Sequence, residues 1–147
     1  MQLYRLTRRV MVATALIASA FTAACGSDSS TGPSAGDVAG AYPMASVRGF
    51  PVPHTFTDAA GSKLTIDGGS ITIDANGTYA LEYKGKLNAM TFDLTDEGTY
   101  TLSGSTLTFV SDDEDDPPFT GRVHGSSVLV DGFKIAGAKF DLRFNGN

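Results

Sequence analysis

Several residue types that build common functional sites are scarce in this sequence of 147 residues. It has one cysteine, which excludes an internal disulfide and a Cys-x-x-Cys zinc or redox site. Its two histidines, His54 and His124, lack the His-Glu-x-x-His spacing of a zinc enzyme, and no nucleophile-elbow sequence accompanies them. We therefore expect no cofactor and no catalytic site built on these residues.

Basic residues are also in the minority. The chain has 11 Lys and Arg against 16 Asp and Glu, a net charge of −5. This balance argues against a protein that binds the phosphate backbone of nucleic acid. Long apolar runs are absent too, because the longest, Val10–Phe21, has 12 apolar or small residues. As a helix it would reach about 18 Å, short of the ~30 Å hydrocarbon core, so it does not predict a permanent transmembrane span.

The apolar run instead fits a signal peptide over residues 1–24. Three arginines and no acidic residue precede it, and the small residues Thr22, Ala23 and Ala24 follow it. The stretch Thr22-Ala23-Ala24-Cys25 resembles the bacterial lipobox. That resemblance implies cleavage before Cys25, diacylglycerol on its thiol and acylation of its amine.

A lipid on Cys25 would fix the protein to a membrane, because several acyl chains together give stable attachment. Gly26 occupies the position at which, in this class of two-membrane bacterial lipoproteins, a residue other than Asp implies the outer membrane. Residues 25–36 are then the lipidated cysteine and a linker without a large apolar side chain, which predicts a flexible tether. Cleavage removes three arginines and no acid, so the mature chain is the more acidic form, at −8.

From residue 37 the pattern becomes that of an all-β domain. Alternating segments flank turn sequences at Asn76-Gly77, Ser103-Gly104 and His124-Gly125-Ser126, which predicts three hairpins over 70–84, 97–110 and 119–131. A last strand is predicted over 139–144, and weaker strands over 42–48, 54–57 and 63–67. We predict an antiparallel up-and-down β-barrel of about eight to ten strands over residues 37–147, because joining the last strand to the first removes the exposed edges that a small sandwich would keep.

Alternation also predicts which side chains face inward. Most of these residues are expected to form the packed core of the barrel, and Tyr79, Tyr83 and Tyr100 are candidate ligand-binding residues because a buried hydroxyl needs a partner. The predicted inward set is Ile71, Ile73, Tyr79, Leu81, Tyr83, Tyr100, Leu102, Leu107, Phe109, Val128, Val130, Phe140, Leu142 and Phe144.

The order and spacing of several segments resemble the bacterial lipocalin-like domains of small envelope lipoproteins. The matching segments are Gly40-Ala41-Tyr42, Val47 to Pro53, Gly69 to Tyr79 and Gly98 to Phe109. The resemblance implies a calycin-type barrel in which a Gly-x-Trp near the first strand packs against an Arg of the last strand. Here Gly40-x-Tyr42 and Arg143 stand at comparable positions, so Tyr42 and Arg143 are the candidate barrel-closure pair.

These observations predict a lipid-anchored protein of the bacterial cell envelope, most specifically of the outer membrane. Its barrel is expected to be noncatalytic and to bind a small apolar molecule or lipid. The alternative is a packed barrel without a ligand that acts as a structural or protein-interaction module at the membrane surface. Alternation does not decide between the two, because inward side chains can either fill a barrel or line a pocket.

The densest charge feature is a run of five acids followed by two prolines. Clustered carboxylates are suitable ligands for calcium, but the run lacks the alternating spacing that wraps a chain around one ion. A solvated loop is the favoured interpretation, which repulsion and the prolines would keep extended. The weak calcium candidates are Asp112, Asp113, Glu114, Asp115 and Asp116.

Overall fold

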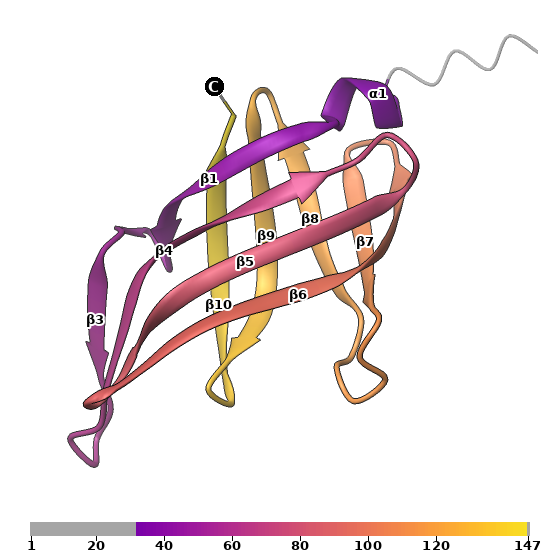
Figure 1. Cartoon of the computed structure of the whole chain (residues 1–147). Helices are drawn as coiled ribbons and strands as arrows, with labels where there is room; N and C mark the ends of the chain where they lie inside the picture. Colours follow the sequence, from indigo (N-terminus) through magenta and orange to yellow (C-terminus); the bar gives the residue numbers. More distant parts are fainter. Residues whose placement is uncertain (1–31, 147) are drawn as a thin grey trace, which may run out of the picture.

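Ten antiparallel strands and one helical turn make up residues 32–146, the part of the chain that the computed structural model describes (Figure 1). The elements are α1 (Ala35–Val38), β1 (Gly40–Val47), β2 (Phe50–Pro51), β3 (His54–Thr57), β4 (Lys63–Ile73), β5 (Thr78–Leu87), β6 (Met90–Ser103), β7 (Thr106–Ser111), β8 (Phe119–His124), β9 (Ser127–Ile135) and β10 (Ala138–Asn145).

Eight of these strands close into a barrel. Neighbours in sequence pair from β4 to β10, and β1 completes the ring by pairing with both β10 and β4. The first half of β1 lies against the end of β4, with Tyr42 opposite Ile71, and its second half lies against β10, with Val47 opposite Leu142. The predicted closed antiparallel barrel is therefore confirmed, and β2 and β3 are additional short strands outside the ring.

The three predicted hairpins form at their predicted turns, but several strands are longer than the sequence suggested. β4 joins the predicted strand 63–67 to the first arm of the hairpin 70–84, and β5 runs to Leu87 rather than to residue 84. β6 begins at Met90, whereas alternation from Glu97 was the predicted start. β9 continues to Ile135 and joins β10 through Ala136-Gly137, where φ is +50° and +80°. Both angles are positive, as a tight two-residue hairpin turn requires. These extensions lengthen the lower part of the barrel in Figure 1.

The predicted inward set forms the core. All of its members are buried except Tyr83 and Leu102, which pack partly buried against the others. At the upper end in Figure 1, Val38 of α1 is fully buried, and the Tyr42 hydroxyl donates a 2.8 Å hydrogen bond to its carbonyl. The upper half of the barrel is thus a packed interior rather than a pocket.

The helix α1 was not predicted, and it begins inside the proposed linker 25–36. Its first turn is capped by Asp37, whose carboxylate accepts hydrogen bonds from the Ser34 amide and hydroxyl at 2.8 Å and 2.7 Å. A helix of four residues is too short to show an apolar period, and only Val38 is buried. The helix α1 therefore lies across the predicted boundary between the linker and the barrel domain.

Below the point where β1 and β4 diverge, a cluster of aromatic side chains fills the space between β4 and β10. The rings of Phe50 and His54 stack with centroids 4.3 Å apart, and Phe56 lies 5.3 Å from Phe140. Arg48 lies over Phe140 at 4.5 Å and donates a 2.7 Å hydrogen bond to the Lys139 carbonyl. We call this side of the barrel the closed seam.

Candidate ligand-binding cleft

On the opposite side the barrel wall opens between β6 and β9. β7 pairs with β6 only from Gly98 onward, and β8 pairs with β9 only as far as Asp131. Within residues 32–146, the segments 90–97 of β6 and 132–135 of β9 therefore keep one edge with no strand beside it. We call this gap the open seam, because unpaired strand edges leave a way into the barrel.

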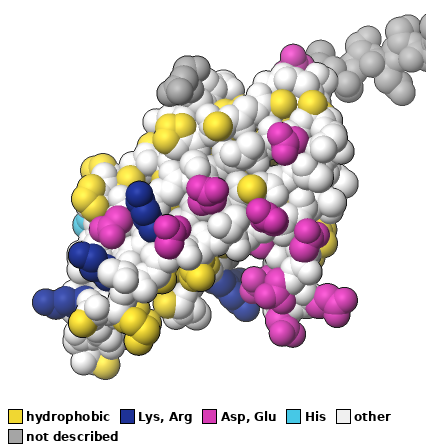
Figure 2. Space-filling view, viewed as in Figure 1, with side chains coloured by type: hydrophobic (Ala, Val, Ile, Leu, Met, Phe, Trp, Pro, Cys, Tyr) yellow, Lys and Arg dark blue, Asp and Glu magenta, His cyan; other side chains and the backbone are white. Residues whose placement is uncertain are grey.

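A cleft of about 970 Å³ lies in the open seam. It extends from residues 94–97 of β6 to residues 131–134 of β9, and the acidic loop 111–118 between β7 and β8 lies along its rim. Figure 2 shows acidic side chains gathered at the lower right of the molecule, where Figure 1 places this loop. Six carboxylates line the cleft against two ammonium groups, those of Lys134 and Lys139.

Asp96 is the half-buried carboxylate of the cleft. It lies opposite Leu81 of β5, so its side chain points to the inner face of the sheet. Its two oxygens accept hydrogen bonds from the Tyr79 hydroxyl at 2.9 Å and the Ser111 hydroxyl at 2.5 Å. Burial raises the pKa of Asp96, and Asp116 and Asp113 raise it further, while the two hydroxyl hydrogen bonds lower it without cancelling the shift.

Three aromatic rings from different strands form the wall of the cleft. Phe133 of β9 lies between Tyr83 of β5 and Phe119 of β8, at centroid distances of 5.4 Å and 5.1 Å. Both contacts are edge-to-face. Burial raises the pKa of Tyr83, and the charges of Asp96 and Asp116, which line the same cleft, raise it further.

A smaller apolar hollow of about 230 Å³ continues the cleft along β6. Leu94 lines both spaces, and the hollow is otherwise bounded by Leu87, Met90, Phe92 and the β9–β10 turn. Leu87, Met90 and Leu94 are 38%, 74% and 49% exposed, although each lies on the inner face of its strand. The lower barrel therefore presents apolar surface that the protein itself leaves uncovered.

Neither the protein-family models nor the curated proteins match this chain. The geometry of the described residues, 32–146, defines the site. Among them, no helix is both long and apolar enough to span a bilayer. The predicted signal peptide 1–24, Cys25 and most of the predicted linker lie outside the described residues.

The three tyrosines predicted to contact a ligand lie in three different environments. Tyr83 lines the cleft. Tyr79 is buried beneath it and reaches the site through its hydrogen bond to Asp96. Tyr100 belongs to the packed half, where its hydroxyl donates to the Asp74 carbonyl at 2.9 Å.

Sequence reasoning missed Asp96, Phe119 and Phe133. Asp96 could have been predicted from the sequence. Side chains alternate between the two faces of a strand, so residue 96 lies on the same inner face as Tyr100. Phe133 could not have been predicted in this way, because the register of β9 and β10 shifts between Phe140 and Leu142. After Val130, this bulge makes Phe133 the next inward residue of β9.

The proposed closure pair does not form. Tyr42 points into the barrel, whereas Arg143 is exposed between the buried side chains Leu142 and Phe144 and therefore lies on the outer face. Its Nε donates to the side-chain oxygen of Asn145 at 3.2 Å. Packing against an aromatic ring in the lower barrel belongs instead to Arg48, on the closed seam.

The acidic loop is folded rather than extended. The Asp115 amide donates to the Asp113 carboxylate at 3.0 Å, and the Asp116 amide donates to the Asp113 carbonyl at 3.1 Å. In residues 32–146, no three His, Cys, Asp or Glu side chains come together as a set of metal ligands. The calcium interpretation of this loop therefore has no geometric support. Asp112, Asp113 and Asp116 line the cleft, whereas Glu114 and Asp115 do not.

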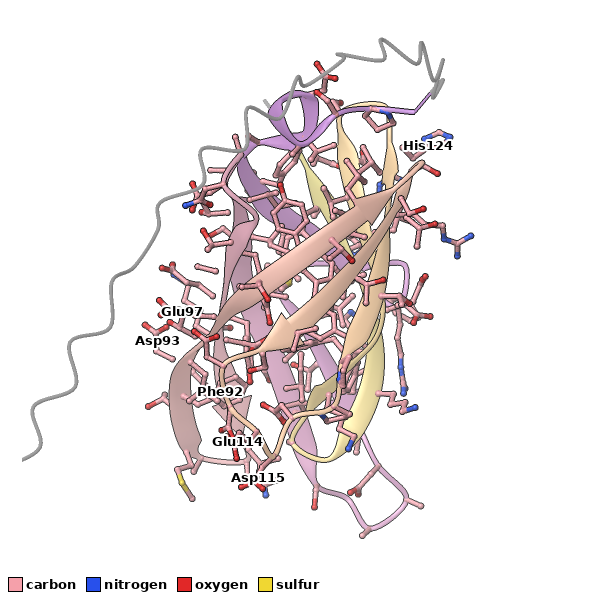
Figure 3. All side chains as sticks on the ribbon, turned by 90° about the vertical axis from the view of Figure 1, so that its right-hand side faces the viewer. Phe92, Asp93, Glu97, Glu114, Asp115 and His124 are labelled. Carbon is pink, nitrogen blue, oxygen red and sulfur yellow. The ribbon has the colours of Figure 1, made fainter. Side chains whose placement is uncertain are left out.

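The histidines stand apart from the cleft. His54 packs between Phe50 and Phe56 on the closed seam, at ring distances of 4.3 Å and 4.7 Å. His124 ends β8, and Figure 3 shows it at the end of the barrel opposite Glu114 and Asp115. Neither histidine is among the residues that line the cleft.

Proposed function

We propose that this protein is a lipid-anchored, noncatalytic binding protein of the bacterial cell envelope, most specifically of the outer membrane. Its ligand is a small apolar molecule or a lipid, and the binding site is the cleft in the open seam. The observation that carries this proposal is the cleft itself, an opening of about 970 Å³ in the wall of an otherwise packed barrel.

The size and lining of the cleft support a binding role. Small-molecule sites are concave spaces of about 300–1,000 Å³, mostly apolar, with a few placed polar groups. Here Tyr83, Phe119 and Phe133 supply the apolar wall, and Asp96 supplies a fixed polar group. The exposed Leu87, Met90 and Leu94 extend the apolar surface toward solvent, where a long ligand would cover them.

Attachment to a membrane rests on the sequence around Cys25. Mass spectrometry of the protein extracted from bacterial membranes is expected to give a chain that begins at Cys25 and carries acyl groups. The Cys25→Ser variant is expected to lack them and to leave the membrane fraction. An unmodified Cys25 in the membrane-extracted chain would contradict lipidation.

Ligand binding is tested by native mass spectrometry and solvent extraction of the purified protein, which are expected to show a co-purified apolar molecule. Leu94→Lys would place a charge in the apolar part of the cleft, and the bound molecule should be lost. Val110→Lys is the matched control, because Val110 is similarly exposed, at 47% against 49%, but does not line the cleft. No bound molecule in either form, and no uptake of added lipid, would favour a packed module that acts through its surface.

A further inference from the structure

We propose that the ligand of the cleft is an organic cation with an apolar tail, of the alkylammonium class. This inference deepens the proposed function and rests on it. The cationic head would lie against the aromatic wall and the acidic rim, and the tail would lie along Leu94 in the apolar hollow of β6.

The first argument is the combination of aromatic rings with carboxylates. Organic ammonium groups are held by aromatic faces, which attract a cation through the ring quadrupole. Phe133 meets Tyr83 and Phe119 edge-to-face, so the rings form a corner rather than a flat stack. The Asp96 carboxylate and the acidic rim line the same cleft as Tyr83, so a cation in this corner would lie among aromatic rings and negative charge together.

The second argument is that Asp96 has no basic partner. The only ion pair in the described chain joins Arg122 to Asp131 at 3.2 Å, so the hydrogen bonds to Asp96 come from two neutral hydroxyls. The two lysines of the cleft lie opposite each other on β9 and β10 and are exposed, on the face opposite Phe133 and Phe140. Five of the six cleft carboxylates, all but Asp131, therefore form no ion pair within residues 32–146, and a bound cation would compensate their charge.

The third argument is the continuity of the two spaces. Leu94 lines both the charged cleft and the hollow at Leu87 and Met90. A ligand that spans both needs a charged end and an apolar end. An anionic amphiphile such as a fatty acid would instead bring its carboxylate against Asp96 and the rim acids, where like charges repel.

Three ligands of equal chain length test the proposal: decyltrimethylammonium, decanol and decanoate. The affinity of the full chain carrying Cys25→Ser, purified without detergent, is measured for each by calorimetry below the micellar concentration. We expect the ammonium compound to bind about tenfold more tightly than decanol, in the range of a cation–π contact with added charge, and decanoate to bind most weakly.

Matched variants separate the cleft from the overall negative charge of the protein. Asp113→Asn with Asp116→Asn removes two acids that line the cleft, and Glu114→Gln with Asp115→Asn removes two from the same loop that do not. The first pair is expected to lose most of the tenfold preference for the cation while keeping decanol binding. The second pair is expected to keep the preference.

Each other result has a defined meaning. Equal affinity for the three ligands, or tighter binding of decanoate, would overturn the cation proposal and leave an apolar binding site. An equal loss in both pairs of variants would also overturn it, because the attraction would then come from net charge. No binding of any of the three ligands would contradict the proposed function itself and the cation proposal with it.

Discussion

At the scale of single residues, the carboxylate of Asp96 is half-buried, and burial disfavours its charged form. Because burial raises its pKa above the ordinary 3.8, the native state holds the Asp96 proton more tightly than the unfolded chain does. The contribution of this group to stability is therefore greatest at low pH, and it falls as the pH rises from about 4 through the raised pKa. A carboxylate in a cleft whose pKa is raised by burial is typical of a functional site.

Asp96→Asn is accordingly expected to raise the melting temperature at neutral pH, because the amide carries no charge and still has an oxygen to accept a hydroxyl. The gain over the wild type should shrink as the pH is lowered through the raised pKa of Asp96, because the wild-type carboxyl then becomes protonated and loses its charge. Melting curves between pH 4 and 7.5 measure this difference. Asp93→Asn is the control, because Asp93 is exposed on the outer face of β6 (Figure 3) and its substitution should give no such pH-dependent gain. A pH-independent effect of Asp96→Asn would contradict the argument.

Arg48 and Arg143 make a second comparison at this scale. Arg48→Ala removes the contact with Phe140 and the hydrogen bond to Lys139, so the free energy of unfolding is expected to fall by about 1–2 kcal/mol. Arg143→Ala on the outer face is expected to change it by less than about 0.5 kcal/mol. Urea unfolding of the two variants measures both values. Equal losses would show that Arg48 does not stabilise the closed seam.

The sequence alone could not have shown which of these two arginines packs against an aromatic ring. Arg143 stands on a predicted strand, and the resemblance to calycin barrels gave it a role. Arg48 stands at the end of a weak strand, where φ is +50°, and Phe140, the ring it lies nearest to, is far away in sequence. A cation–π contact of this kind has no local sequence pattern, so it becomes visible only when β1 and β10 are placed side by side.

At the scale of elements, the strands that bury one face were predicted, and the strand segments beside the open seam were not. The upper part of β6 alternates Tyr100 with exposed threonines and was recognised. Its lower part also alternates, but the inward residue after Leu94 is Asp96. A charged residue at an inward position indicates the end of an apolar pattern, so this part of the strand was not predicted. The cleft lies where the amphipathic pattern is interrupted, and a functional site is the usual reason for such a departure from a consistent fold.

The β9–β10 turn was missed for a related reason. Ala136 occupies the first of two positions with positive φ, at +50°, where Asn or Gly is the usual signal. An alanine there costs about 1 kcal/mol relative to glycine. Ala136→Gly is therefore expected to raise the free energy of unfolding by about 0.5–1 kcal/mol, as measured by urea unfolding. A loss of stability would indicate that the methyl group of Ala136, beside the apolar hollow, contributes more through packing than it costs in the turn.

At the scale of the whole molecule, neighbouring strands of the barrel separate at two places, the closed seam and the open seam, and the two differ in what covers the gap. Where β1 leaves β4, the strand β3 pairs along β4, and a cluster of four rings covers the gap, with Arg48 packed over two of them. The rings are those of Phe50, His54, Phe56 and Phe140. Where β6 leaves β7, no strand is added in the described chain, and the acidic loop lies along the edge. The same closure problem thus produces packing on one side and an open cleft on the other.

Hydrogen exchange of backbone amides should reveal this asymmetry. Residues 98 and 99 of β6 pair with both β5 and β7, and the Tyr100 amide donates to the Gly77 carbonyl, so the amides of residues 98–100 are expected to be uniformly protected. Residues 90–97 are paired with β5 alone, so alternate amides face the open seam and should exchange much faster. Lower β4 is the internal control, because residues 63–66 lie between β3 and β5 and should remain protected. Equal protection along the whole of β6, measured residue by residue by NMR, would show that the seam is closed in solution and would remove the entrance on which ligand binding depends.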